Sequence, residues 1–315
     1  MIIKQNKTHK AFTMIELIFV IVIMGILSKF GIEFLAQAYT TFIHSSVNHT
    51  LQSNSEAAVE FVSTRLQHRI KASTIARETN GSFTLLSNYY GQTAPILEWI
   101  GADIDGFRGD ANGSWSGIID LNSTLTTSVT LHSPETNTTA LNNLIKILSN
   151  NAATVNDSAI YFVNPNALAT ADGWGWDGNS ATFNVTNQSG LNIHPVRSAI
   201  LTNKFIPKMG SVSPTNSLSG VTASEYYQLA WTAYAVGITD WNNTGHETGT
   251  LTMWYNYQPW QGEDYNTSGT AVKIMENVSS FRFIASMSVV KIQVCVKSTL
   301  IQNEEYALCK EKTIF

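Results

Sequence analysis

Residues 12–30 read FTMIELIFVIVIMGILSKF, an apolar run with few polar side chains. From Phe12 to Leu27 its only polar side chains are those of Thr13 and Glu16. A helix rising about 1.5 Å per residue would make this stretch about 28 Å long, close to the roughly 30 Å hydrocarbon core of a bilayer. The sequence therefore predicts a transmembrane helix at residues 12–30.

The residues before the apolar run predict its orientation. Residues 1–11 contain three lysines and no acidic residue, whereas few basic residues follow directly after the run. Because positively charged flanks stay on the cytoplasmic side, we expect residues 1–11 inside and the body of the chain translocated. A removable secretory signal would have a small-x-small site after its apolar region. No such site follows Leu27, and the small residue Ala11 instead precedes the run.

Glu16 is the second unusual feature of this segment. A carboxylate in a membrane segment costs a few kcal/mol at the bilayer centre and less near an end, and it usually marks function. Glu16 lies five residues beyond Ala11, near the cytoplasmic face. There it could pair with the positive N-terminus of a neighbouring subunit once subunits lie side by side.

The segment Lys10–Leu17, KAFTMIEL, resembles the cleavage and methylation signature of type IV prepilins and type II secretion pseudopilins. The resemblance implies that a prepilin peptidase cuts between Ala11 and Phe12 and methylates the new amine of Phe12. It also implies that Glu16 neutralises that amine in the adjacent subunit during assembly. Two positions depart from the pattern: Ala11 stands where the family usually has Gly, and Glu33 where many major pilins have a helix-kinking Pro.

The same resemblance implies a non-enzymatic structural subunit, and the large body favours a minor pilin or minor pseudopilin. Its expected partners are other pilins or pseudopilins, the prepilin peptidase and the inner-membrane assembly platform, with the lipid bilayer around it before assembly. The protein would pass once through a bacterial inner membrane, with its body in the periplasm. The alternatives are a plain signal anchor and a membrane-anchored periplasmic enzyme or carbohydrate-binding protein that uses the helix only as an anchor.

Beyond the membrane the helix is expected to continue over residues 31–80. This segment lacks Gly and Pro after Ile32, and Asn80-Gly81 supplies a stop signal. Apolar residues recur along it at helical spacing, at Leu35, Tyr39, Phe42, Val47, Leu51, Ala58, Val62, Leu66 and Ile70. We expect this amphipathic stripe to pack against a sheet.

The body divides into two parts. Residues 81–220 are polar and loop-rich, with Ala140–Leu148 as the best helix candidate, and we expect an insertion on the sheet. Residues 221–315 contain four runs rich in aromatic and β-branched residues, typical of an antiparallel meander: YYQLAWTAYAVGI, TLTMWYNYQPW, SSFRFIASMS and VVKIQVCVKS. Leu251–Trp260 followed by Val278–Lys297 resembles the C-terminal sheet of larger minor pilins and of J-type minor pseudopilins. The predicted fold class is α+β, a long N-terminal helix packed on a C-terminal antiparallel sheet.

The chain has two cysteines, Cys295 and Cys309. In an exported chain they predict a disulfide, which would close a C-terminal loop like that of type IV pilins. A loop of this length would add roughly 3 kcal/mol to stability in the chain-entropy model. The alternative is a pair of unpaired buried thiols.

Several function classes lack support. A net charge of −4 gives no electrostatic footprint for nucleic acid or for an anionic membrane surface. No P-loop, G-x-S-x-G or H-E-x-x-H motif occurs, and the seven histidines are dispersed. Residues 173–178, GWGWDG, formally match a dinucleotide motif, but no helix start follows, so we expect a turn with exposed or half-buried tryptophans. We expect no cofactor and no enzyme.

The loop DIDGFRGDANG is a candidate calcium site. Its oxygen-bearing side chains lie at short spacing, at Asp103, Asp105, Asp110 and Asn112. The spacing does not match an EF-hand and no Glu closes the loop, so a solvated acidic turn is the alternative.

Asn-x-Ser/Thr tripeptides are frequent, with eleven beyond residues 1–11. In six of them an acidic residue stands two positions before the asparagine: Asn80, Asn112, Asn122, Asn137, Asn242 and Asn266. Bacterial N-linked oligosaccharyltransferases prefer an acidic residue at that position. These six asparagines are therefore candidates for glycosylation.

Overall fold

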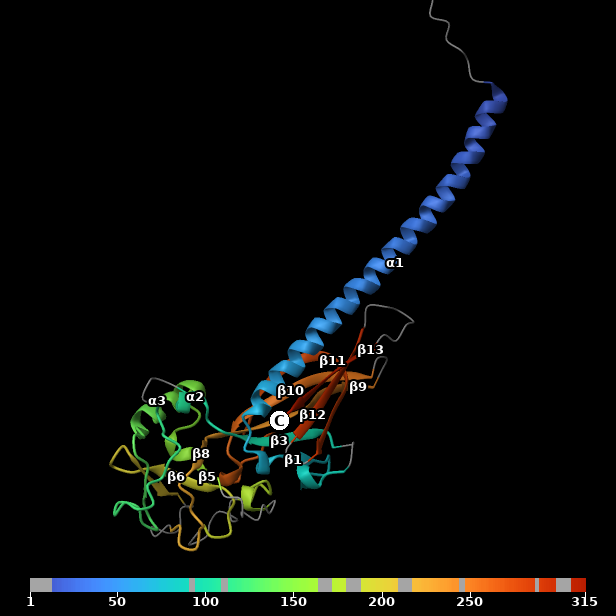
Figure 1. Cartoon of the computed structure of the whole chain (residues 1–315). Helices are drawn as coiled ribbons and strands as arrows, with labels where there is room; N and C mark the ends of the chain where they lie inside the picture. Colours follow the sequence, from blue (N-terminus) through green and yellow to red (C-terminus); the bar gives the residue numbers. More distant parts are fainter. Residues whose placement is uncertain are drawn as a thin grey trace, which may run out of the picture. The chain divides into compact units, whose positions relative to one another are not determined.

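The computed structural model describes residues 13–90, 94–108, 113–163, 172–179, 188–208, 217–243, 247–286, 289–298 and 307–315. The chain forms two compact units, Met1–Thr50 and Leu51–Phe315. The boundary between them falls inside helix α1 (Met14–Gln67). The fold is α+β, as predicted: the long apolar N-terminal helix is followed by antiparallel sheets (Figure 1).

The first unit consists, in its described part, of helix α1 up to Thr50. Every side chain from Thr13 to Phe42 is exposed, including large apolar ones such as Phe19 and Ile21. The helix is long and apolar enough to cross a membrane. Such complete exposure of an apolar surface would be unfavourable in water, and it fits a membrane-anchored protein.

In the second unit, the last turns of α1 pack on a sheet. Ala58, Val62 and Leu66 of the predicted stripe are buried in the main hydrophobic core. Their partners there come from several strands and include Leu97, Trp99, Val236, Leu251 and Met253. The prediction that the outer part of the helix packs against a sheet is thus confirmed for residues 58–66. Burying a side chain of the size of Val62 or Leu66 contributes about 1.5–3 kcal/mol.

Helix α1 ends at Gln67, and its predicted continuation to Asn80 is wrong. Beyond Gln67 the backbone bonds to a distant strand: the Ile70 amide donates to the Ile100 carbonyl at 2.9 Å, and the His68 carbonyl accepts from the Ala102 amide at 2.9 Å. Arg69 is buried and donates from Nη1 to the Leu66 carbonyl at 2.8 Å. A cation on the last helical carbonyls is a favourable C-terminal cap.

The main sheet has eight strands in the order β13-β12-β11-β10-β9-β3-β1-β2, all paired antiparallel (Figure 1). Five of them come from the C-terminal region: β9 (Thr232–Asn242), β10 (Thr248–Tyr257), β11 (Thr270–Ser286), β12 (Val289–Lys297) and β13 (Ala307–Ile314). The first four contain strands predicted for the antiparallel meander, whereas β13 lies where a disulfide loop was predicted. Three come from earlier in the chain: β1 (Ile75–Arg77), β2 (Phe83–Leu85) and β3 (Ile96–Gly101). Segments 75–85 and 96–101 thus belong to the sheet rather than to the predicted helix and loop-rich region.

A second sheet has five strands in the order β4-β7-β6-β5-β8. Its strands are β4 (Leu131–His132), β5 (Ala159–Phe162), β6 (His194–Ser198), β7 (Lys204–Pro207) and β8 (Tyr227–Ala230). Two helices accompany it, α2 (Asp105–Arg108) and α3 (Thr138–Leu148). Only one residue, Trp231, separates β8 of this sheet from β9 of the main sheet.

The predicted loop-rich region therefore contains a sheet with a core of its own. Trp115, Leu141, Ile145, Phe205 and Leu229 are all buried in that core. The predicted helix at Ala140–Leu148 is confirmed as α3, whose first amides donate to the side chain of Asn137. Sequence inspection missed the second sheet because its strands span only two to five residues, too few for an alternating pattern to stand out.

His194 of β6 gives the second sheet a dependence on pH. Burial lowers the pKa of His194 to about 4 from 6.5, and its Nδ1 lies 3.2 Å from Oε1 of Gln188. In the unfolded chain the imidazole binds a proton near pH 6.5, whereas in the folded chain it does so only near pH 4. The neutral buried imidazole therefore contributes fully to the stability of the fold above pH 6.5, and this stability is lost as the pH falls towards 4. Between pH 7 and pH 5, we expect the free energy of unfolding of the parent protein to decrease by about 2 kcal/mol more than that of the variant His194→Gln.

Urea titrations of the full chain in detergent at the two pH values measure this difference. His49→Gln, which removes an exposed histidine of α1, is the matched control and should keep the dependence of the parent. An equal decrease in the parent and in His194→Gln would contradict the prediction.

Candidate functional site

The first turn of α1 holds Glu16. The carbonyl of Thr13 accepts from the amides of Glu16 and Leu17 at 3.1 and 3.2 Å, so Thr13 starts the helix. The hydroxyl of Thr13 lies 3.3 Å from the Glu16 carboxylate. The spacing Thr-x-x-Glu is typical of helix N-termini, where the helix dipole favours negative charge. Local sequence thus places Glu16 on the first turn of the helix, with its side chain exposed. The predicted cleavage site, Ala11 and Phe12, lies outside the described residues.

Within the described part of the apolar helix, Glu16 has no basic neighbour. Lys29 is the next charged residue along α1, about 20 Å further at the usual helical rise. Lys29 approaches Glu33 instead, with 4.0 Å between Nζ and Oε1, and both side chains are exposed.

Residues 6–28 match the prokaryotic N-terminal methylation motif. The match covers the junction of Ala11 and Phe12, the carboxylate of Glu16 and the apolar run. With the long apolar helix it fits a membrane-anchored protein of the pilin or pseudopilin type, processed by a prepilin peptidase and assembled with other pilins. No curated protein and no solved structure matches the chain.

At the other end of the chain, Cys295 and Cys309 form the predicted disulfide. They face each other in register on β12 and β13. The bond therefore fastens the last strand to the sheet, and the alternative of two free thiols is wrong.

Lysines of β13 contact the helix as well. Lys310 lies 4.0 Å from Glu56, and Lys312 pairs with Glu60, one turn further along α1. The pairs are exposed, and exposed pairs contribute little to stability. Lys310 and Lys312 alternate along β13 with Glu311 and Thr313. The face of β13 that carries the two lysines therefore lies towards the helix. Ile314 on that same face is buried in the main core.

The predicted calcium loop is only partly described, because Asp110 and Asn112 lie outside the described residues. Asp103 is buried and both of its carboxylate oxygens accept hydrogen bonds, from the Gly106 amide at 3.3 Å and from Nε1 of Trp115 at 2.9 Å. Burial raises the pKa of Asp103. Its role is to anchor the start of α2, where Asp105 is exposed. No cluster of three or more metal-ligating side chains occurs within the described part of the chain.

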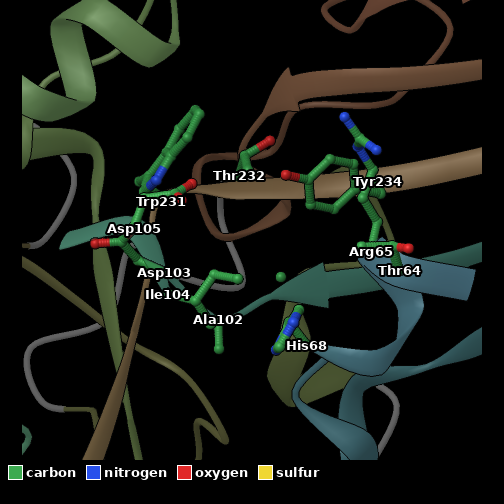
Figure 2. A pocket seen from close by; sticks show the side chains of 11 residues that line it. Thr64, Arg65, His68, Ala102, Asp103, Ile104, Asp105, Trp231, Thr232 and Tyr234 are labelled. Carbon is green, nitrogen blue, oxygen red and sulfur yellow. The ribbon is translucent and has the colours of Figure 1, made fainter. Parts of the chain in front are cut away.

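A small cleft of about 230 Å³ opens beside this loop. In Figure 2, Asp103, Asp105 and Trp231 lie on one side of it, and Arg65 and Tyr234 lie on the other. Burial raises the pKa of Tyr234 to about 12, so its hydroxyl stays protonated at neutral pH. The cleft is smaller than most ligand sites.

The described lining residues also give the cleft no paired nucleophile and base. Its side-chain hydrogen bonds include those from Thr64 and Thr232 to backbone carbonyls and the one that Asp103 accepts from Trp115. Nothing in this arrangement points to catalysis.

A buried ion pair was missed by sequence inspection. Arg77 of β1 pairs through Nε with Glu98 of β3, and its Nη2 donates to the Trp176 carbonyl at 3.0 Å. The other oxygen of Glu98 accepts from the Tyr257 hydroxyl at 3.0 Å. Burial raises the pKa of Glu98, and it raises that of Tyr257 well above the ordinary value. The one signal in the sequence was a lone glutamate inside the apolar strand PILEWIG.

The GWGWDG segment places two tryptophans in a hydrophobic core that also contains Tyr257. Trp174 and Trp176 are fully buried, so the expectation of exposed or half-buried tryptophans is wrong. Nε1 of Trp176 donates to the Ser73 carbonyl at 2.9 Å. The two glycines Gly175 and Gly178 have positive φ and form the turn, which is a packing element rather than a phosphate-binding loop.

Proposed function

We propose that this protein is a non-enzymatic minor subunit of a type IV pilus or of a type II secretion-type filament. The methylation motif at residues 6–28, which includes the first turns of an exposed apolar helix, carries the proposal. A prepilin peptidase cuts between Ala11 and Phe12 and methylates the amine of Phe12. The helix holds the protein in the inner membrane, with the body in the periplasm, until it enters the filament through the assembly platform.

The charges of the helix support assembly beside like copies or other pilins. Glu16 is the one acidic group of the apolar run, and the described part of the helix offers it no cation. A methylated amine at Phe12 of an adjacent subunit would supply one. In an apolar environment such a charge-assisted pair is strong and fixes the axial register of neighbouring helices.

The body supports a specialised rather than a bulk position. Two sheets, each with buried hydrophobic residues of its own, give the second unit a large surface. Glu33 replaces the helix-kinking proline that many major pilins have. We infer a role at initiation or at the filament tip.

Processing is the direct test. The full chain, expressed with a prepilin peptidase and extracted from membranes, should begin with N-methylated Phe12, as read from the mass of its N-terminal peptide. In the same host with an inactive peptidase the chain should begin at Met1. Ala11→Gly, which restores the usual residue before the cut, should be processed at least as fast as the parent.

A mature chain that still starts at Met1 in the presence of active peptidase would overturn the proposal. So would cleavage after Leu27, because that is the behaviour of a removable secretory signal.

A further inference from the structure

The acidic Asn-x-Ser/Thr tripeptides are too frequent to be accidental. Acidic residues make up 23 of 315 positions, so among eleven tripeptides fewer than one should have an acid two places before its asparagine. Six have one. An abundance of asparagine explains many such tripeptides, but it does not explain the acid.

The structure places these asparagines where an enzyme could reach them. All five that lie in the described residues are exposed: Asn80, Asn122, Asn137, Asn242 and Asn266. None of the five acids ahead of them is buried: Glu78, Asp120, Glu135, Asp240 and Asp264. The sixth asparagine, Asn112, lies outside the described residues. All six belong to the second unit.

Turn formation accounts for only part of the pattern. Asp120 and Asp264 each accept from the amide of the asparagine two residues on, as turn-forming aspartates do. The glutamates behave differently: the carboxylate of Glu78 accepts from the Tyr89 hydroxyl at 3.3 Å, and the side chain of Glu135 is exposed. Turn formation therefore does not explain why an acidic residue stands at every one of these positions.

The hydrogen bonds at two of these asparagines are made by the side-chain oxygen, not by the nitrogen that would be modified. Oδ1 of Asn80 accepts from the amide and hydroxyl of Ser82, and Oδ1 of Asn137 accepts from two helix amides. Both residues are exposed.

We propose that these acidic tripeptides are N-glycosylation sites, used on the periplasmic side by an oligosaccharyltransferase that recognises the acid through a basic group. In the reaction Nδ2 of asparagine loses a proton and forms a bond to C1 of the sugar. The bond between C1 and the phosphate oxygen of a lipid-diphosphate-linked oligosaccharide breaks, and the lipid diphosphate leaves with the electron pair.

The positions suit a filament subunit. Helix α1 contains one such tripeptide, at Asn48, and there the residue two places before is Ser46 rather than an acid. Glycans would thus cover the body and leave the helix free to pack. The inference rests on the proposed function in one respect, because it needs the body to be exported.

Glycopeptide mapping of the full chain tests the proposal, with the chain co-expressed with prepilin peptidase, a bacterial oligosaccharyltransferase of acidic preference and its lipid-linked oligosaccharide. We expect glycan at the acidic sites. The chain contains matched internal controls in Asn156 and Asn277, which are exposed but preceded by Thr154 and Met275 at the same position. These two should remain unmodified.

Conservative variants remove the acid without touching the acceptor. Glu78→Gln should reduce occupancy at Asn80 to the level of Asn156, and Asp264→Asn should do the same at Asn266, while the remaining sites stay modified. Because one site changes at a time, occupancy elsewhere shows that the variant is folded and exported.

The outcomes separate the two proposals. A chain that starts at Phe12 but carries no glycan overturns the glycosylation and leaves the filament function standing. Equal occupancy at Asn156, Asn277 and the acidic sites also overturns it. Glycan on a chain that still starts at Met1 supports the glycosylation and counts against the filament function.

Discussion

Glu16→Ala is expected to abolish incorporation into the filament while the precursor is still made, inserted and folded. The carboxylate stands on the first turn of an apolar helix, and its described neighbours offer no cation. Assembly would place it against the amine of Phe12 in the adjacent subunit. Breaking a buried ion pair by removing one partner costs about 3–5 kcal/mol, so incorporation should fall at least about a hundredfold.

The measurement is the amount of protein in sheared filaments relative to membranes, with the other subunits co-expressed. Glu33→Ala is the matched control, because it removes a glutamate from the same helix that is exposed and approaches Lys29. Exposed pairs of this kind contribute about 0.3–0.5 kcal/mol, so this variant should assemble like the parent.

Normal assembly of Glu16→Ala would contradict the predicted role. It would favour the alternative class, in which the helix only anchors a periplasmic enzyme or carbohydrate-binding protein. In that class the activity of the body and its membrane location should not depend on Glu16. A binding assay against a panel of sugars, on parent and variant, would then be the next measurement.

The N-terminal features could be read from sequence because they are local. The helix start at Thr13 and Glu16 depends on neighbours three residues apart, and the methylation motif is a continuous segment. The stripe of Ala58, Val62 and Leu66 is likewise a regular pattern within one element. Long strands of the meander, such as β11 with 17 residues, also have enough positions for a pattern to be recognised.

The end of helix α1 could not be read in the same way. Residues 68–80 have no Gly or Pro to end a helix before Asn80. What ends it is bonding of the His68 and Ile70 backbones to β3, about thirty residues later in the chain. Tertiary bonding overrides local propensity here, as is common where a backbone segment is buried.

The burial of Arg77, Glu98 and Trp176 could not be predicted from the sequence for a similar reason. Arg77 and Glu98 are 21 residues apart, and Tyr257 is 159 residues from Glu98. Trp176 reaches a backbone carbonyl 103 residues away. No local pattern encodes contacts of this kind, and composition alone cannot say whether a tryptophan lies in a core.

Arg77→Met should lower the free energy of unfolding of the body by about 3–5 kcal/mol. The substitution removes the guanidinium but leaves Glu98, which is fully buried, without its cation. It also removes the donor to the Trp176 carbonyl. Because the pair joins β1 to β3, its loss weakens the main sheet close to the edge formed by β2. Urea unfolding of the full chain in detergent, followed by tryptophan fluorescence, measures it.

A second variant distinguishes the effect of an unpaired carboxylate from that of the lost hydrogen bonds to backbone carbonyls. Arg77→Met combined with Glu98→Gln removes both charges and keeps an oxygen that can accept from the Tyr257 hydroxyl. If the unpaired carboxylate causes the loss, the double variant should be more stable than Arg77→Met alone. Lys291→Met, which breaks the exposed pair with Glu311, should leave the urea midpoint nearly unchanged. Equal destabilisation of the single and double variants would show instead that the lost hydrogen bonds from the guanidinium to the Gly81 and Trp176 carbonyls, not the unpaired carboxylate, cause the loss.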